Sequence, residues 1–420
     1  MAHLGSNLHS FHLTSIDSIT DIVRKVIREQ QVVTYFQPIV SVKNRSIIGL
    51  EALSRGTPAL SSIIPPKLLF EQAALLGMTI ELDRLCRDTA LTAFQPITFA
   101  HPDLFLFLNF DTTIIDKGVV GSGYLHKSTE KRNLQAGNIV IEISESNIQD
   151  VDLLKKFIQM YKSYGFLFAL DDIGIGSSNL DRILLTKPDI LKIDRCLING
   201  IDHDYYKQEL FSSIVNIAKK VGALVVAEGV ETETEAIVCC EIGADLLQGF
   251  YFAKPQPANC PILPETFTLA IDSVNKLFKQ YRVDKISAKV HTHQLYKTIA
   301  HNLTDELAKT PPELFEEKLK KLAHYPNLEY VYILARNGIQ ISNSVCDTCA
   351  FPGSKKRLFN AAQKGTDQSL KDYYLYLHSG LTEYITDPYI SYASGSLCVT
   401  VSMLFTSADQ QFILCADFTV

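Results

Sequence analysis

The stretch "FALDDIGIGSS", residues 168–178, ends an apolar run with two adjacent carboxylates, Asp171 and Asp172. Adjacent carboxylates repel each other, and their pKa values rise, unless a cation lies beside them. The run before them is short and apolar, and it is bounded by glycines, as in a buried strand. The stretch therefore predicts a strand whose end carries acidic side chains to a cation.

Seven more runs of this kind occur before residue 252, and longer amphipathic segments separate most of them. This alternation is typical of βα units around a parallel sheet. Eight such runs predict a modified (β/α)8 barrel of the TIM type within an α/β fold. The runs are residues 32–40, 46–53, 104–110, 139–143, 166–172, 189–194, 223–229 and 244–250.

The first two runs are separated only by "SVKNR", residues 41–45. This connection is too short for the crossover helix that parallel strands need. We therefore expect an antiparallel first strand at the start of the barrel.

Composition limits the classes of function. The chain has 420 residues, of which 46% are hydrophobic and 20% charged, as in a globular protein of two or three domains. A net charge of −6 gives no general attraction for nucleic acid or an anionic membrane. The N-terminal residues lack a secretory pattern, and no run is long enough to span a membrane, so we expect a cytoplasmic protein with reduced cysteines.

Polar side chains recur where the predicted barrel strands end, and the carboxyl ends of parallel barrel strands gather on one face. A single acid at a strand end is more often a helix cap or a solvated rim residue, but this many together favours one shared site. They are Glu51, Asn109, Glu142, Asp171, Asp172, Lys192, Asp194, Glu228 and Gln248.

Oxygen ligands without converging histidine or cysteine favour Mg²⁺ or Mn²⁺ over Zn²⁺. Two such ions, about 3.5–4 Å apart, polarise a phosphoryl group and generate a nucleophile. Lys192, in an otherwise apolar strand, needs acidic partners, although a structural salt bridge would also explain it. "GIGSSN" half-matches a dinucleotide fingerprint, but it lacks the third glycine, and the preceding acids would repel a pyrophosphate.

The motifs resemble the EAL-domain family. "YFQPIVSVKNRSIIGLEALSR" is similar to the family's opening, which is named for a tripeptide present here as Glu51-Ala52-Leu53. The blocks "LNF", "IEISES", "DDIGIGSSNL", "LKID", "AEGVE" and "LQGFYFAKP" follow in family order. The resemblance implies hydrolysis of cyclic di-GMP to linear pGpG with two Mg²⁺ or Mn²⁺ ions. Family members that have lost ligands only bind cyclic di-GMP.

The resemblance also implies roles for individual residues. Asp171 would bridge the two ions, Lys192 and Glu228 would orient or assist the attacking water, and Glu51 would be essential for catalysis. Glu145 would hold the loop after the paired aspartates, and Asp194 would support the ligands. The remaining assignments are metal ligation by Glu51, Asn109, Glu142, Asp171, Asp172 and Glu228, and substrate contacts by Gln37, Arg55 and Gln248.

The chain departs from the family pattern in the loop after the paired aspartates. Ile173, Ile175 and Ser177 stand where the family usually has Phe, Thr and Tyr, and the chain has no tryptophan. That loop joins the metal site to the dimer interface in the family. We therefore keep a weak or inactive cyclic di-GMP receptor as the alternative, and we expect a homodimer.

The rhythm changes after the barrel, which we assign to residues 1–263. Residues 264–312 predict a helical connector, and residues 313–420 resemble, more weakly, an α+β PAS or Cache-like sensory or dimerisation domain. Asn337-Gly338 predicts a β-hairpin turn in it. If this domain binds a small ligand, we expect contacts from Lys371, Tyr389 and Asp417.

Cys346 and Cys349 form one CxxC pair, which is only half of a zinc site. We interpret them as ordinary loop cysteines.

Overall fold

The computed structural model describes residues 16–58, 63–117, 121–144, 150–174, 179–260, 264–346 and 360–420. The chain divides into two compact units, Met1–Arg282 and Val283–Val420. Glu145 and Cys349 lie outside the described residues.

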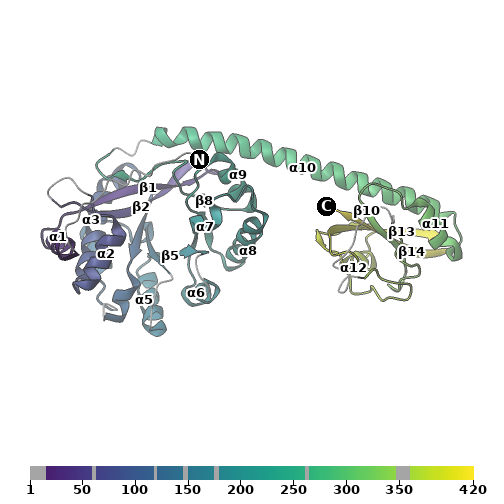
Figure 1. The fold of residues 1–420 in the computed structure, drawn as a ribbon, viewed down its shortest axis with the longest axis horizontal. Coiled ribbons are helices and arrows are strands. Elements are labelled where there is room, and N and C mark those ends of the chain that lie inside the picture. Colours follow the sequence, from purple (N-terminus) through teal and green to yellow (C-terminus); the bar gives the residue numbers. More distant parts are fainter. Residues whose placement is uncertain are drawn as a thin grey trace. The chain divides into compact units, whose positions relative to one another are not determined.

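The first unit contains the expected barrel, which Figure 1 shows. Neighbouring strands from β2 to β8 are parallel, whereas β1 is antiparallel to both β2 and β8 and closes the sheet between them. The antiparallel first strand is thus confirmed. A short strand, β9 (Gln256–Pro257), also pairs with β1 and was not expected. The barrel strands are β1 (Val32–Ser41), β2 (Ser46–Gly56), β3 (Phe105–Phe110), β4 (Ile139–Ile143), β5 (Leu167–Ile173), β6 (Ile190–Ile193), β7 (Leu224–Ala227) and β8 (Leu246–Leu247).

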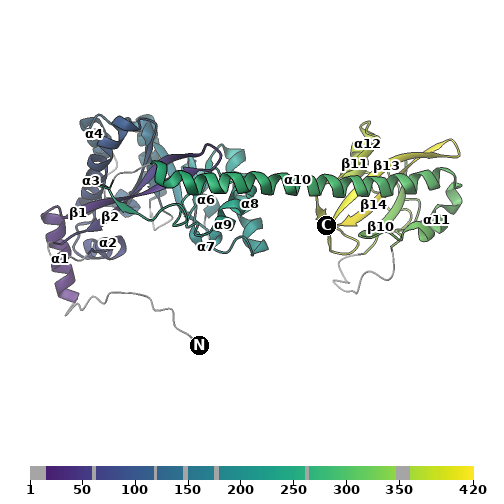
Figure 2. The same ribbon diagram turned by 90° about the horizontal axis from the view of Figure 1, so that it is seen from above.

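Helices surround this sheet, and their apolar faces pack on the outward side chains of the strands in one large core. The helices are α2 (Pro66–Leu75), α3 (Thr79–Ala100), α4 (Tyr124–Lys131), α5 (Val151–Ser163), α6 (Asn179–Thr186), α7 (Arg195–Ile198), α8 (Tyr205–Val221) and α9 (Glu233–Ile242), with 3₁₀ turns at Thr112–Lys117 and Ala136–Asn138. Helix α1 (Ile16–Arg28) lies beside β1, β2 and α2 in Figure 2. Its Val23 and Val26 side chains belong to a separate apolar cluster.

The barrel interior has its own apolar layer. Each barrel strand except β2 contributes one buried side chain to this layer. At the corresponding place β2 has Gly49, and there is no room for a side chain there because a Cβ would lie 2.7 Å from the Phe107 ring. The layer consists of Ile39, Phe107, Val140, Ala169, Ile190, Val226 and Leu246.

The expected connector contains a single long helix, α10 (Pro264–Ala308). Near its start, Phe267, Ile271 and Val274 are buried in the core of the barrel. Nearer its end, Tyr296 and Leu303 are buried in the core of the second unit. Among the described residues, no helix combines the length and apolarity required to cross a membrane.

The second unit is α+β, with an antiparallel sheet in the order β10-β14-β13-β11 and β12 paired with β13. Its assignment to the PAS or Cache class stays a prediction. Its elements are the 3₁₀ turn Pro312–Leu314, α11 (Phe315–Leu322), β10 (Leu328–Ala335), α12 (Asp372–His378), β11 (Glu383–Ile385), β12 (Tyr389–Ile390), β13 (Leu397–Ser407) and β14 (Gln410–Thr419).

The two faces of this sheet are covered differently, as Figure 1 shows. Alternate residues of β14 belong to two clusters because successive strand side chains point to opposite faces. Leu414 and Ala416 pack with α10 and α11, whereas Ile413 and Cys415 pack with α12.

The turn at Asn337-Gly338 forms, with Gly338 at φ +84°. The chain after it makes only isolated bridges to β10, and the long partner of β10 is β14. The expected local strand pair was therefore only partly right.

Candidate active site

The polar residues of the predicted site extend the barrel interior by one step. Each follows by two positions a residue of the inner apolar layer or, for Glu51, the Gly49 that stands at the corresponding place in β2. Phe107 precedes Asn109 and Val140 precedes Glu142, and the same spacing continues around the sheet. Because strand side chains alternate with a period of two, the polar residues share the interior face with that layer. The apolar layer is therefore the floor of the site. The residues placed on it in this way are Glu51, Asn109, Glu142, Asp171, Lys192, Glu228 and Gln248.

Asp171 and Asp172 are neighbours in a strand, yet both line the same cavities. In a regular strand they would face opposite sides of the sheet. The pairing of β5 with β6 shifts register between Leu170 and Ile173, and Asp172 adopts a left-handed backbone with φ +59°. This irregularity turns both carboxylates toward the site.

Lys192 is the centre of the site's charges, and its side chain is 1% exposed. Its Nζ lies 2.5 Å from Glu142 Oε1 and 2.6 Å from Glu228 Oε1. Asp171 Oδ1 is 3.4 Å away and Glu51 Oε2 is 3.8 Å away. The acidic partners that the sequence required for Lys192 are thus these four carboxylates.

Amide side chains orient Glu51 from both sides. Asn109 Nδ2 donates to Glu51 Oε1 at 3.0 Å, and Gln248 Nε2 donates to Glu51 Oε2 at 2.6 Å. Gln248 Nε2 also lies 3.2 Å from Gln37 Oε1, and Gln37 donates to the carbonyl oxygen of Ala253. Residues from β1, β2 and β3 are therefore joined with Gln248, which directly follows β8, in one hydrogen-bonded group.

Burial and mutual repulsion shape the protonation of the acids. Burial raises the pKa of Glu142 well above its usual range, against the opposing attraction of Lys192. Burial raises the pKa of Glu228 to about 8. Burial and the adjacent Asp171 raise the pKa of Asp172 to about 6. For Lys192, burial lowers the pKa, but the surrounding carboxylates outweigh it and hold the pKa well above its ordinary value.

The donor set suits hard divalent cations. Within the described ranges, no group of three or more His, Cys, Asp or Glu side chains is already arranged to hold a metal, because the carboxylates converge on Lys192. However, one ammonium group faces the acids Glu51, Glu142, Asp171 and Glu228, with Asp172 beside them. Glu142 Oε2 is buried without a hydrogen-bond donor. Such oxygen atoms with excess negative charge fit Mg²⁺ or Mn²⁺.

Two cavities meet at the acids. One, of about 430 Å³, reaches from Glu51, Asn109 and Asp171 toward α2 and α3. The other, of about 290 Å³, is lined by Lys192, Glu228 and Gln248. Glu51, Asp171 and Asp172 line both, so the acidic cluster lies between two chambers, each large enough for part of a small ligand.

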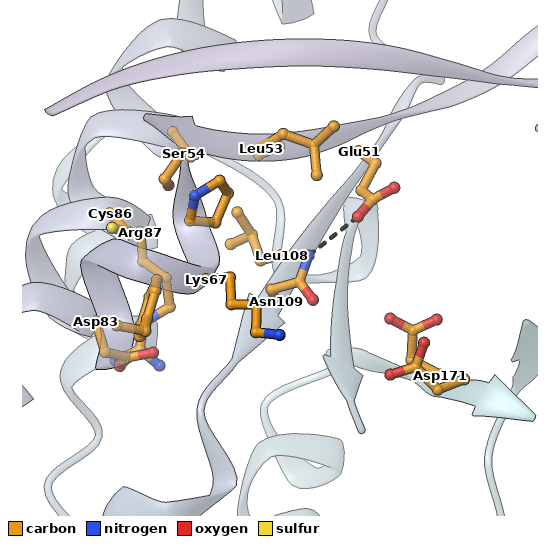
Figure 3. Close-up of a pocket in the computed structure, with 15 residues that line it drawn as sticks. Glu51, Leu53, Ser54, Lys67, Asp83, Cys86, Arg87, Leu108, Asn109 and Asp171 are labelled. Carbon is orange, nitrogen blue, oxygen red and sulfur yellow. Dashed lines mark hydrogen bonds and ion pairs between the residues drawn. The ribbon is translucent and has the colours of Figure 1, made fainter. Parts of the chain in front are cut away.

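Figure 3 shows the first chamber, with Glu51 and Asn109 joined by a hydrogen bond and Asp171 nearby. The opposite wall comes from α3, where Arg87 forms an ion pair with Asp83. Burial raises the pKa of Asp83 to about 6, and Arg87 opposes that rise. Lys67, on α2, adds an exposed cation.

Four of these lining residues were not predicted from the sequence: Lys67, Asp83, Arg87 and Arg195. Arg195 lines the second chamber and pairs with Glu231 at 2.8 Å. Asp83 and Arg87 are four residues apart between apolar neighbours, a spacing that places both on one buried helix face. This buried ion pair was the one signal available for them.

Three predicted residues lie away from the cavity walls: Glu142, which is buried beside Lys192, Arg55 and Asp194. Arg55 is not among the lining residues of either chamber; its guanidinium lies over the Tyr35 ring, 5.6 Å from the centroid. Asp194 caps α7 by accepting a hydrogen bond from the backbone of Cys196 at 2.7 Å. Glu145 lies outside the described residues.

Comparison with known families identifies residues 20–255 as an EAL domain. This match covers more than half of the chain, and the chain therefore belongs to the EAL-domain family.

Some similar proteins match this chain over the barrel alone, and others match it over most of its length. MucR of Pseudomonas aeruginosa, named a bifunctional diguanylate cyclase/cyclic di-GMP phosphodiesterase, is 28% identical over 56% of this chain, which spans only 35% of MucR. YkuI of Bacillus subtilis, named an uncharacterized EAL-domain protein, is 27% identical over 79% of this chain and 80% of its own length.

Solved structures show the same fold. The crystal structure of YkuI in complex with its substrate cyclic di-GMP and calcium matches with a TM-score of 0.78 and 25% identity, over 95% of this chain and 98% of that chain. A manganese and cyclic di-GMP complex of BlrP1 from Klebsiella pneumoniae matches with a TM-score of 0.50 and 26% identity, over 54% of this chain and 57% of that one.

Proposed function

We propose that this chain is a phosphodiesterase that hydrolyses cyclic di-GMP to linear pGpG with two divalent cations. The observation that carries the proposal is the convergence of Glu51, Glu142, Asp171 and Glu228 on Lys192 above a closed apolar floor. Relatives named for this activity, and structures of relatives that hold cyclic di-GMP, support it.

Glu51, Asn109, Glu142, Asp171, Asp172 and Glu228 would hold the two ions, Mg²⁺ or Mn²⁺. When bound, such ions polarise a phosphodiester and lower the pKa of water. Asp171 suits a shared ligand because it lines both chambers.

The chain's own groups position the reactants. With its Nζ among four carboxylates, Lys192 orients a water beside the scissile phosphate by donating a hydrogen bond. Glu228 Oε1 lies 2.6 Å from Lys192 Nζ, so its carboxylate is placed to assist in orienting the same water.

The two chambers suit the two halves of a cyclic dinucleotide, with its phosphates near the acids between them. Each chamber carries an exposed cation, Lys67 in the first and Arg195 in the second. Gln37 and Gln248 present amide groups to the second chamber, as base or ribose contacts require. The expected substrate contact by Arg55 needs its guanidinium to leave the Tyr35 ring.

The direct test is turnover of cyclic di-GMP by the purified full chain. We expect pGpG to form with Mg²⁺ or Mn²⁺ and not with a chelator, and Ca²⁺ to inhibit, because its longer bonds spoil the two-ion geometry. Failure to form product with either ion would rule out the enzyme.

The first prediction concerns Glu51→Ala, which should lower turnover by at least a hundredfold, because it removes one metal ligand and the partner of Asn109 and Gln248. Glu81→Ala is the matched control, because Glu81 is an exposed acid on α3. Activity of Glu51→Ala within a few-fold of Glu81→Ala would contradict the assignment.

A cyclic di-GMP receptor is the alternative, because Ile173, Ile175 and Ser177 replace the residues usual in the loop after the paired aspartates. Calorimetry that finds tight binding of cyclic di-GMP without product would support the receptor. We also propose that the chain acts as a homodimer whose second unit regulates the barrel; sedimentation analysis tests the first part.

A further inference from the structure

The second unit contains a cavity of about 80 Å³. The three residues expected to contact a ligand, Lys371, Tyr389 and Asp417, all line it. A cavity of this size has room for a small ligand.

Asp417 is the charged group at the buried end of this cavity, and it is 4% exposed. It lies on β14 between Thr400 of β13 and Tyr330 of β10. The Thr400 hydroxyl donates to Asp417 Oδ1 at 2.7 Å, and Tyr389 Oη is 2.6 Å from the same hydroxyl. Because Thr400 has one proton and gives it to Asp417, Tyr389 must donate to Thr400.

The Asp417 carboxylate thus accepts a hydrogen bond from a neutral hydroxyl but has no cationic partner. Among the described residues, no Lys, Arg or His side chain lies within ion-pair distance of Asp417. A buried carboxylate in this state lacks the compensation that a buried charge needs. Burial raises the pKa of Asp417 to about 7, as expected for an acid without a counter-ion.

Tyrosine rings make up much of the remaining wall. Tyr332 and Tyr373 are buried and meet edge to face at 6.2 Å. Aromatic faces attract cations, and a buried carboxylate attracts them more strongly. The wall therefore selects a positive group and repels an anion at the Asp417 end.

The cavity has an opposite charge at its exposed side. Lys371 is exposed, and its Nζ lies over the Tyr392 ring, 5.0 Å from the centroid. A ligand with an acidic group could place that group toward Lys371. The two ends thus allow either a simple amine or a small zwitterion.

We propose that this cavity binds a small primary ammonium compound, with its ammonium group against the Asp417 carboxylate and its carbon atoms between the tyrosine rings. The class includes short amines and the smallest amino acids, which share the ammonium group. The site is separate from the acidic cluster of the barrel and does not depend on the function proposed for it.

Calorimetry of the full chain tests the proposal with four probes: ethylamine, glycine, ethanol and acetate. We expect ethylamine or glycine to bind at millimolar concentration, and ethanol and acetate not to bind. Binding of ethylamine indicates a simple amine, and binding of glycine alone indicates a zwitterion. Absence of binding by both ammonium probes, or preference for acetate, would overturn the proposal.

Two variants locate the bound group. Asp417→Asn should weaken binding of the ammonium probe at least tenfold, whereas Lys371→Gln should leave ethylamine binding unchanged and weaken only glycine. If Asp417→Asn fails to fold, as judged by circular dichroism, Tyr389→Phe replaces it; it removes a polar hydroxyl from the cavity wall beside Thr400 and should weaken binding several-fold. Unchanged affinity in the folded variant would place the ligand elsewhere.

Discussion

At the residue scale, the charge balance of the barrel site depends on Lys192. Its ammonium group is buried among four carboxylates, two of them within 2.6 Å. Removing one partner of a buried ion pair leaves the other uncompensated, which costs more than the pair itself contributes. Lys192 therefore stabilises the acids when no divalent cation is bound, whatever part it plays in the reaction.

Lys192→Met should lower the free energy of unfolding of the metal-free protein by about 3–5 kcal/mol. Divalent cations should recover part of the loss, since they supply the missing positive charge. Urea denaturation with chelator and with Mg²⁺ measures both effects.

Lys276→Met is the control for this prediction, because Lys276 is exposed. Its effect should stay within about 0.5 kcal/mol. A loss in Lys192→Met that does not depend on Mg²⁺ would mean that the acids do not bind the ion.

A pH dependence follows from Asp417. Burial raises its pKa to about 7 in the folded chain, above the ordinary value of 3.8. A raised carboxyl pKa means that the folded state holds the proton more tightly than the unfolded state. The stabilisation is thus complete below pH 3.8 and is lost as the pH rises through 7.

The measurement compares the wild type with Asp417→Asn, whose amide does not titrate. The free energy of unfolding of the wild type, relative to the variant, should fall by roughly 2–4 kcal/mol between acidic and neutral pH. Parallel pH profiles for the two proteins would show that Asp417 does not titrate in this range.

At the scale of elements, the period of two within each strand explains which part of the site was predictable. Strand-end residues such as Glu142 and Asn109 could be predicted because sheet pairing alone places them together. Asp83 and Arg87 could not, because their approach depends on how α3 packs on the barrel. The Asn337-Gly338 turn was likewise visible, but the pairing of β10 with β14 is long-range.

The backbone at Gly249 predicts a sharp response to a single methyl group. A Cβ there would lie 2.0 Å from the Val230 carbonyl oxygen, and the neighbouring Gln248 donates to Glu51. Gly249→Ala should therefore lower the free energy of unfolding by about 1–3 kcal/mol and displace Gln248. Thermal melting and cyclic di-GMP binding measure the two effects.

Gly137→Ala is the matched control. The nearest atom to its new Cβ is the Gly165 carbonyl oxygen at 3.9 Å, an ordinary contact. Equal stability of the two variants would show that the segment at Val230 moves aside freely.

At the scale of the whole molecule, the barrel includes the start of α10. Phe267, Ile271 and Val274 are buried in the barrel core, so a truncation at residue 264 removes part of that core. Each such side chain contributes about 1.5–3 kcal/mol. Residues 1–282 should therefore melt cooperatively at a higher temperature than residues 1–264.

Comparing the two fragments with the full chain also tests regulation by the second unit. If residues 1–282 keep the turnover of the full chain, the second unit does not hold the barrel inactive. Equal melting temperatures for the two fragments would show that the start of α10 does not stabilise the barrel.

Strand β14 joins the two faces of the second unit's sheet. Asp417 faces the cavity, while its neighbour Phe418 faces α10 and stacks on Tyr296 with ring centroids 4.1 Å apart. Because adjacent residues share a peptide plane, a change around Asp417 reaches the helix without crossing a loop. A ligand in the cavity that moves Asp417 would thus also move the adjacent Phe418, which packs against Tyr296 of α10.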